Sequence, residues 1–480
     1  MNYETVVGLE VHAELSTNTK IYCSCKNAFG GEVNAQCCPI CTGMPGTLPT
    51  LNKKVVEYAV RMGYALNCGL NRICKQDRKN YFYPDLPKAY QISQFDVPLC
   101  ENGYLDVWVD GQEKRIGVTR IHIEEDAGKL LHDESFSGSL VDFNRCGVPL
   151  IEIVSEPDMR SSKEAKAYLE TIRSILLALD ISDCKMQEGS IRCDVNVSVR
   201  PQGSDTFGTR CEMKNVNSFS GAVRAIEYET KRQIEIIEDG GVIVQETRRW
   251  DDVKGMSFTM RSKEDAQDYR YFPEPDLKTI VLEEDDLRRM KESIPELPNK
   301  KLIRYMKDYK LPEFDANLLS ENPEKSKFFE SCLEAAKVEP KTLSNWIVGD
   351  VTRILNEQGI GITESVLTPE KLTALIQLID KGTISNTAGK TVLDEMFATG
   401  GRPDDIVREK GLSQISDASA LEELAKGVLA DNQKSVDDYR GGKTNALGYL
   451  VGQCMRASKG KGNPQTIREI LLKVLQSEGS

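Results

Sequence analysis

The stretch GLEVHAELSTNTKIYCSCKNAFGGEVNAQCCPICTGMPGTLP, residues 8–49, places two kinds of metal ligand in one short segment. Its start alternates apolar and polar residues, which predicts a β-strand with Glu10, His12 and Glu14 on the polar face. A Cys-x-Cys pair and a Cys-x-x-Cys pair follow directly. Carboxylates and imidazole suit Mg²⁺, whereas thiolates suit Zn²⁺. The segment therefore predicts one metal environment for chemistry and a second one that holds a loop.

The cysteine pairs have the spacing that tetrahedral zinc requires, and the Gly30-Gly31 turn lets the intervening loop fold back. Four sulfurs close the coordination shell, so we expect structural zinc and no open catalytic position. Cys37 is spare in this arrangement, and a set of unmetallated thiols is the alternative. The predicted zinc ligands are Cys23, Cys25, Cys38 and Cys41.

Composition is that of an ordinary soluble protein of two to four domains: 480 residues, 40% hydrophobic and 28% charged. The sequence has no apolar run long enough for a membrane span and no secretory start, so we expect a cytoplasmic protein. Its 14 cysteines are then expected as reduced thiols and metal ligands. A net charge of −12 argues against a surface coated with basic residues.

Charge is nevertheless uneven along the chain. Residues 439–468 contain basic side chains and no acidic residue, which is typical of a small module that contacts a polyanion. A solvated helical tail is the other interpretation. The basic residues are Arg440, Lys443, Arg456, Lys459, Lys461 and Arg468.

Three further segments, residues 116–125, 191–199 and 209–215, alternate in the same way as residues 5–15. Such alternation is typical of an antiparallel sheet with one buried and one polar face. A helix that begins with the capping-box pattern Ser161-x-x-Glu164 is expected to pack on the apolar face. The predicted fold class is therefore α+β.

After residue 290 the residue pattern predicts helices, and Thr368-Pro369-Glu370 is expected to begin one of them. A Gly/Pro hinge at residues 398–405 precedes another helical region. We predict a sheet-rich domain over residues 1–290, a helical domain over 291–405 and a small helical tail over 406–480.

The polar strand faces suggest a magnesium site. Glu10, His12, Glu125 and Glu212 form a chemically sensible ligand set, because Mg²⁺ accepts carboxylates and bridges phosphates. The parity of the 116–125 strand leaves open whether Glu124 or Glu125 faces the site. Solvated or hydrogen-bonded side chains are the alternative.

The segment DRKNYFYPDLPKAYQISQ, residues 77–94, mixes cations with aromatic residues. Lys79 and Lys88 suit contact with phosphate, and Tyr81 and Tyr90 suit stacking on a base or ribose. A packed loop whose tyrosines fill gaps is the alternative. The similar segment DYRYFPEPDL, residues 268–277, is interpreted as a structural strand end. No phosphate loop, G-x-G-x-x-G motif or nucleophilic triad is found.

Several long segments resemble one family, the B subunit of aspartyl/glutamyl-tRNA amidotransferases (GatB). They are VVGLEVHAEL, DRKNYFYPDLPKAYQISQ, RIHIEEDAGK, PLIEIVSEPD, QEGSIRCDVNVS, EMKNVNSF, QETRRW, DYRYFPEPDL and DYRGGKTNALGYLVGQCMRASKGKGNP. The resemblance implies a sheet-based cradle, a helical domain and a tRNA-contacting tail. It also implies a glutamine-dependent ligase that forms a carbon–nitrogen bond. ATP phosphorylates the side-chain carboxylate of Glu-tRNA(Gln) or Asp-tRNA(Asn), and ammonia from a separate A subunit displaces phosphate. A small C subunit is the third expected partner.

Within that resemblance, the polar strand faces and the 77–94 loop supply the expected site residues. Lys79, Lys88, Arg192 and Lys214 are expected to neutralise phosphate, and Asp194 and Asn196 to position metal-bound water or nucleotide. Lys443, Arg456, Lys459 and Lys461 are the expected tRNA contacts. The competing hypotheses are a non-catalytic scaffold that presents tRNA to a catalytic partner, and a free-standing metalloenzyme acting on a small molecule.

Overall fold

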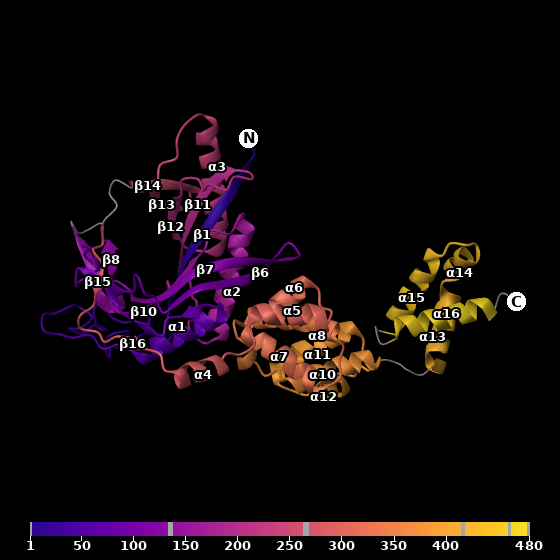
Figure 1. The fold of residues 1–480 in the computed structure, drawn as a ribbon. Helices are drawn as coiled ribbons and strands as arrows, with labels where there is room; N and C mark the ends of the chain where they lie inside the picture. The colour runs from indigo at the N-terminus through magenta and orange to yellow at the C-terminus, as the bar shows by residue number, and fades with distance from the viewer. Residues whose placement is uncertain (1, 133–137, 263–267, 414–417, 459–461, 478–480) are drawn as a thin grey trace. The chain divides into compact units, whose positions relative to one another are not determined.

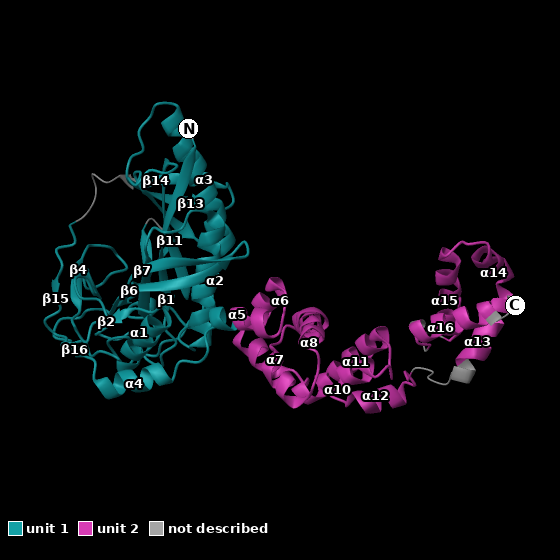
Figure 2. Cartoon of the chain, turned by 45° about the vertical axis from the view of Figure 1, so that its right-hand side comes forward, with its two compact units in different colours: residues 1–301 teal, residues 302–480 magenta. Residues whose placement is uncertain are grey.

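The computed structural model describes residues 2–132, 138–262, 268–413, 418–458 and 462–477. The chain divides into two compact units, residues 1–301 and 302–480 (Figure 2). An α+β first unit and a helical second unit confirm the predicted fold class. The predicted division at residues 290 and 405 stays a prediction.

Unit 1 is built on a nine-stranded sheet within the described residues, in the order β14-β13-β12-β11-β1-β10-β7-β6-β2. Neighbouring strands are antiparallel except β12 and β13, which run parallel because α3 lies between them in the chain. The strands are β1 (Tyr3–Glu14), β2 (Gly69–Leu70), β6 (Cys100–Val109), β7 (Gln112–Glu125), β10 (Pro149–Ser155), β11 (Ile191–Pro201), β12 (Cys211–Val216), β13 (Glu246–Asp251) and β14 (Met256–Ser262).

Strand β1 lies inside the sheet, between β10 and β11. Its apolar face is fully buried, as the alternation predicts, with Val7, Leu9, Val11 and Ala13 in the core. Helices α1 (Lys53–Ala65), α2 (Ser162–Ala178) and α3 (Phe219–Glu238) contribute to that same core. Figure 1 shows α2 and α3 lying along the sheet. The opposite face of β1 carries the polar side chains of Glu10, His12 and Glu14.

Helix α2 begins at the predicted cap. The Ser161 hydroxyl accepts from the Glu164 amide at 3.2 Å, which satisfies one free N–H of the first turn. The Glu164 carboxylate accepts from the Arg160 amide at 2.6 Å, one residue before the partner that a capping box predicts.

Shorter strands cover one end of the polar face. β4 (Asp77–Asn80) pairs with both β5 (Tyr90–Ser93) and β15 (Phe272–Pro273). Two further pairs are β3 (Ile73–Cys74) with β16 (Ile280–Val281), and β8 (Lys129–His132) with β9 (Ser139–Asp142). The cysteine loop folds against β9, where the Asn34 amide donates to Asp142 Oδ1 at 3.1 Å.

Helices α4 (Glu284–Glu292) and α5 (Pro298–Asp308) lead to unit 2, which is helical. Thr368 caps α10 and Pro369 occupies its first turn, as predicted. The helices α13 to α16 enclose a hydrophobic cluster between Leu421 and Leu475. No helix in the described ranges is long and apolar enough to cross a membrane. The helices of unit 2 are α6 (Glu313–Ser320), α7 (Pro323–Ala335), α8 (Pro340–Trp346), α9 (Thr352–Gln358), α10 (Pro369–Asp380), α11 (Asn386–Thr399), α12 (Pro403–Glu409), α13 (Ala418–Asp431), α14 (Gln433–Arg440), α15 (Asn445–Ala457) and α16 (Pro464–Ser477).

Candidate functional site

The register of β1, β11 and β12 creates a first acidic cluster on the polar face. Glu10 lies opposite Asp194, and Asn196 of β11 lies opposite Glu212. One oxygen from each of Glu10, Asp194 and Glu212 lies within 4.8 Å of the others. Three convergent carboxylates are a ligand set that suits Mg²⁺.

Three side chains hold this first cluster in place, and one of them, Thr247 of β13, donates to Glu212 Oε2 at 2.8 Å. Lys214 Nζ contacts Asp194 Oδ2 at 2.5 Å and Glu212 Oε1 at 2.9 Å, so one ammonium bridges two carboxylates. Asn196 donates to Glu10 Oε1 at 3.0 Å. Burial raises the pKa of Glu10, and the neighbouring charges of Glu152, Glu212 and Asp194 raise it further.

A second cluster lies on the other side of β1. Glu152 of β10 is opposite His12 on one side and His122 of β7 on the other. His12 Nε2 lies 3.5 Å from Glu152 Oε2 and 3.8 Å from Glu124 Oε1. His122 Nε2 lies 3.1 Å from Glu152 Oε2. His12, Glu124 and Glu152 form the second group of potential metal ligands.

The histidines in this second cluster differ in their surroundings. Burial disfavours the His12 cation, but the hydrogen bond to Glu152 and the charges of Glu152 and Glu124 raise its pKa to about 9. His122 accepts a hydrogen bond at Nδ1 from Arg120 Nε at 3.3 Å. Its Nε2 faces Glu152, and the carboxylates of Glu152 and Glu124 raise the pKa of His122 against the effect of burial.

Lys79 differs from the other predicted phosphate ligands. Within the described part of the chain its side chain forms no hydrogen bond or ion pair. Its Nζ lies 4.9 Å from the Tyr269 ring centroid and 5.9 Å from that of Tyr81. Burial opposes its charge, but Glu124 and Glu152 are among the groups that raise the pKa of Lys79. A positive charge is therefore held beside the second cluster without a direct counter-ion.

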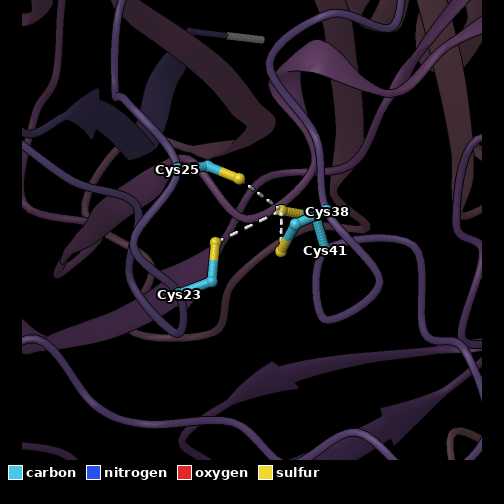
Figure 3. Close-up of side chains that lie close together, drawn as sticks. All are labelled: Cys23, Cys25, Cys38 and Cys41. Carbon is cyan, nitrogen blue, oxygen red and sulfur yellow. Dashed lines mark hydrogen bonds between the residues drawn. The ribbon is translucent and has the colours of Figure 1, made fainter.

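The four predicted zinc ligands converge, with their sulfur atoms facing one another (Figure 3). The Sγ atom of Cys41 lies 3.2 Å from Cys23, 3.6 Å from Cys38 and 3.8 Å from Cys25. Four sulfurs about 2.3 Å from one tetrahedral ion are about 3.8 Å apart, so this set fits zinc. Cys37 lies outside the cluster, and its thiol donates to the Asn34 carbonyl at 3.2 Å.

Comparison with known proteins gives matches over nearly the whole chain. The GatB/GatE catalytic domain model matches residues 5–288, and the GatB domain model matches residues 327–475. Proteins named as the B subunit of aspartyl/glutamyl-tRNA(Asn/Gln) amidotransferase are similar throughout. The one from Caldicellulosiruptor bescii is 60% identical over 99% of this chain and 100% of its own. The one from Clostridium botulinum is 51% identical over 98% of each.

The chain belongs to the GatB family. The resemblance found in the sequence is thereby confirmed. The Thermoanaerobacter pseudethanolicus protein of the same name is 57% identical over 98% of this chain and 99% of its own, so the relatives match from end to end.

In this GatB family member, the structure does not bring the predicted magnesium ligands into one group. Glu10 and Glu212 belong to the first cluster, and His12 belongs to the second. Glu125 points away from both: its carboxylate binds Lys88 and accepts from the Ile92 amide at 2.9 Å. The sequence left open whether Glu124 or Glu125 faces the site, and the structure places Glu124 in the second cluster.

The predicted cations are also separated. Arg192 Nη2 contacts Asp126 Oδ2 at 2.6 Å, beyond the two clusters. Lys88 lies with Glu125 at a cavity of about 200 Å³ beside the cysteine loop. The residues predicted to bind the nucleotide form two separate pairs. Tyr81 lies near Lys79, whereas the Lys88 Nζ lies 5.6 Å from the centroid of the Tyr90 ring.

Sequence reasoning missed Glu152, which holds both histidines. A signal was present, because Glu152 is the one acid in the otherwise uncharged strand PLIEIVS, residues 149–155.

The structure describes two of the four residues predicted to contact tRNA in the tail. Arg456 lies in the last turn of α15, and Lys443 pairs with Asp438 at 2.8 Å. Lys459 and Lys461 lie outside the described residues.

Proposed function

We propose that this chain is the B subunit of a glutamine-dependent tRNA amidotransferase, a ligase that forms a carbon–nitrogen bond. It uses ATP to phosphorylate the side-chain carboxylate of Glu-tRNA(Gln) or Asp-tRNA(Asn), and ammonia converts that intermediate to the amide. The observation that carries the proposal is the pair of acidic clusters on one sheet face, beside a lysine that has no ion pair among the described residues. Full-length relatives with that name support it.

Phosphoryl transfer needs positioning and charge neutralisation more than a covalent nucleophile. Bound Mg²⁺ would supply neutralisation of the phosphate oxygens. The three carboxylates of the first cluster fit it in ligand type, whereas the second cluster offers two carboxylates and an imidazole. The chain's own contribution is orientation: Asn196 fixes Glu10, Lys214 fixes Asp194 and Glu212, and Arg120 fixes His122. Lys79 remains available to a phosphate oxygen.

The chemistry balances in two steps. The carboxylate oxygen of the aminoacyl side chain bonds to the γ-phosphorus of ATP as the bond to ADP breaks. Ammonia then attacks the carbonyl carbon of the acyl phosphate, phosphate leaves, and a proton is released. Glutamine hydrolysis by a separate A subunit supplies the ammonia, and a small C subunit completes a heterotrimer. We place the complex in the cytoplasm, where its tRNA substrate is charged.

We also propose a structural zinc ion at Cys23, Cys25, Cys38 and Cys41. Lys20 provides independent support, because its side chain is 1% exposed and its Nζ lies 3.8 Å from Cys41 Sγ. A buried ammonium needs nearby negative charge. Four thiolates around Zn²⁺ retain a double negative charge, which a single lysine partly offsets. The Cys23 hydrogen bond and Lys20 lower the pKa of Cys41 to about 4, against the effect of burial.

The proposed function predicts that Glu10→Ala lowers ATP turnover stimulated by Glu-tRNA(Gln) by about 100-fold, because two of three carboxylates remain at that cluster. The measurement is ATP hydrolysis by the complex with its A and C subunits, with and without mischarged tRNA. Undiminished turnover in the variant would instead support the scaffold hypothesis, in which removal of residues 406–480 abolishes function and Glu10 is dispensable.

A second prediction concerns the basic stretch of the tail. Lys443→Ala combined with Arg456→Ala is expected to raise the KM for Glu-tRNA(Gln) about tenfold and to weaken its salt dependence, with kcat unchanged. Lys434→Ala is the matched control, because this exposed lysine of α14 precedes the basic stretch. An unchanged KM and salt dependence in the double variant would make the stretch a merely solvated face.

A further inference from the structure

Three tyrosines form a corner beside the second acidic cluster. Tyr81 follows β4, whereas Tyr269 and Tyr271 come from the segment before β15, far along the chain. The Tyr269 ring centroid lies 6.0 Å from that of Tyr81 and 6.0 Å from that of Tyr271, with interplanar angles of 72° and 69°. The Lys79 ammonium lies 4.9 Å from the centre of the Tyr269 ring. Three rings, packed edge to face, and one cation thus lie close together.

The backbone is fixed so that the rings stay in this corner. The Asn80 amide donates to the Tyr269 carbonyl at 3.0 Å, and its side chain donates to the carbonyls of Tyr269 at 3.1 Å and Arg270 at 2.8 Å. Arg270 has a φ of +46°, a left-handed conformation that is strained for a non-glycine residue. Strain of this kind persists where surrounding contacts hold it.

Tyr271 is supported separately. Its ring stacks on Phe95 with a centroid distance of 4.2 Å and an interplanar angle of 8°. Arg120 holds Phe95 by donating to its carbonyl at 2.6 Å, and the same guanidinium donates to His122 in the second cluster. The aromatic corner and the acidic cluster are therefore joined through Arg120.

The corner retains unused binding capacity. Among the described residues, the hydroxyls of Tyr81, Tyr269 and Tyr271 have no hydrogen-bond partner, and the Lys79 ammonium has no counter-ion in direct contact. All three rings are half-buried, which differs from a filled core. Partly exposed rings with a neighbouring cation are the combination that binds a base and its phosphate.

We propose that Tyr269 and Tyr271, with Tyr81, hold an adenine base beside the acidic clusters, and that Lys79 meets the attached phosphate. This inference rests on the proposed function and adds residues of the 268–271 segment to its site. Two adenines belong to the proposed reaction, the base of ATP and the 3′-terminal adenosine of the tRNA. Both present the same π-face, so the chemistry of recognition is shared.

The test uses the complete complex with its A and C subunits. Equilibrium binding is measured for ATP, for inorganic triphosphate, and for tRNA with and without its terminal adenosine. Tyr269→Ala and Tyr271→Ala are each compared with the Tyr→Phe change at the same position. Phe82→Ala is the matched control, because this ring of the same loop is 86% exposed.

We expect the alanine variants to bind one adenine-containing ligand about tenfold more weakly, the range for loss of one stacked base. The phenylalanine variants and Phe82→Ala are expected to stay within threefold of the wild type. Weaker ATP binding with unchanged triphosphate binding assigns the corner to the nucleotide base. If a variant binds intact tRNA only as tightly as tRNA that lacks its terminal adenosine, the corner binds the end of the tRNA.

Two results would overturn the inference. One is that both alanine variants bind every ligand within threefold of the wild type. The other is that triphosphate binding falls as much as ATP binding, which would mean that the rings only shape the site. Failure of the proposed function is separate: adenine binding that depends on Tyr269 in a complex without tRNA-stimulated ATP hydrolysis would retain this inference and reject that function.

Discussion

Replacing Lys79 with methionine is expected to lower the kcat of tRNA-stimulated ATP hydrolysis by about 1,000-fold, the lower range for removal of a charge that stabilises phosphoryl transfer. The reason is that the Lys79 side chain has no hydrogen bond or ion pair within the described residues and lies near Glu124 and Glu152, so its charge is available to substrate. Thermal stability is expected to change by only a few degrees, because no direct ion pair is lost. Lys79→Arg is expected to recover part of the activity, since it keeps the charge but not the shape.

Lys88→Met is the contrasting variant. Its partner Glu125 is 3% exposed and would remain buried without a cation. Breaking such a pair costs about 3–5 kcal/mol, so this variant should lose about 10 °C in melting temperature. Its turnover per folded molecule should fall far less than that of Lys79→Met. The opposite pattern, with Lys79→Met active and Lys88→Met inactive but stable, would move phosphate binding to the cavity beside the cysteine loop.

These two lysines illustrate what the sequence could predict. Both lie in a segment rich in cations and aromatic residues, and the sequence predicted the same role, phosphate contact, for both. Their separation arises from pairing: the β5 strand that packs on the end of β7 places Ser93 Oγ 3.4 Å from Glu124 and the Ile92 amide 2.9 Å from Glu125. Consecutive residues of a strand point to opposite faces, so Glu124 and Glu125 attract different partners.

Local patterns were the most informative part of the sequence. Alternation along β1 predicted both the buried face and the polar face that carries Glu10 and His12. The order of strands could not be predicted, because it depends on pairings between distant segments. The place of Glu152 between His12 and His122 follows from β10 lying between β1 and β7. The parity of β7 was also ambiguous, since residues 121–126 are all buried and show no alternation.

The spacing of the cysteines predicts the zinc site from one short segment of sequence. Removing one of these cysteines is the second substitution with a large expected effect. Wild-type protein is expected to carry one zinc ion per chain, and Cys41→Ser is expected to lose it. Cys41 is the best position to test because its sulfur contacts all three other sulfurs and Lys20. Loss of a structural metal belongs to the most destabilising class of substitutions, about 4 kcal/mol or more. The melting temperature should fall by about 10 °C.

Cys37→Ser provides the control, because this thiol adjoins the cluster in sequence but donates to the Asn34 carbonyl instead. It should keep both the zinc and the melting temperature. Metal analysis and thermal unfolding of the three proteins, before and after treatment with a chelator, separate the outcomes. Chelation should bring the wild type and Cys37→Ser to the stability of Cys41→Ser and leave Cys41→Ser unchanged. A wild-type protein without zinc, or equal zinc loss in both variants, would contradict a Cys23-Cys25-Cys38-Cys41 site. In that case the negative charge beside Lys20 would have to come from the Cys41 thiolate alone.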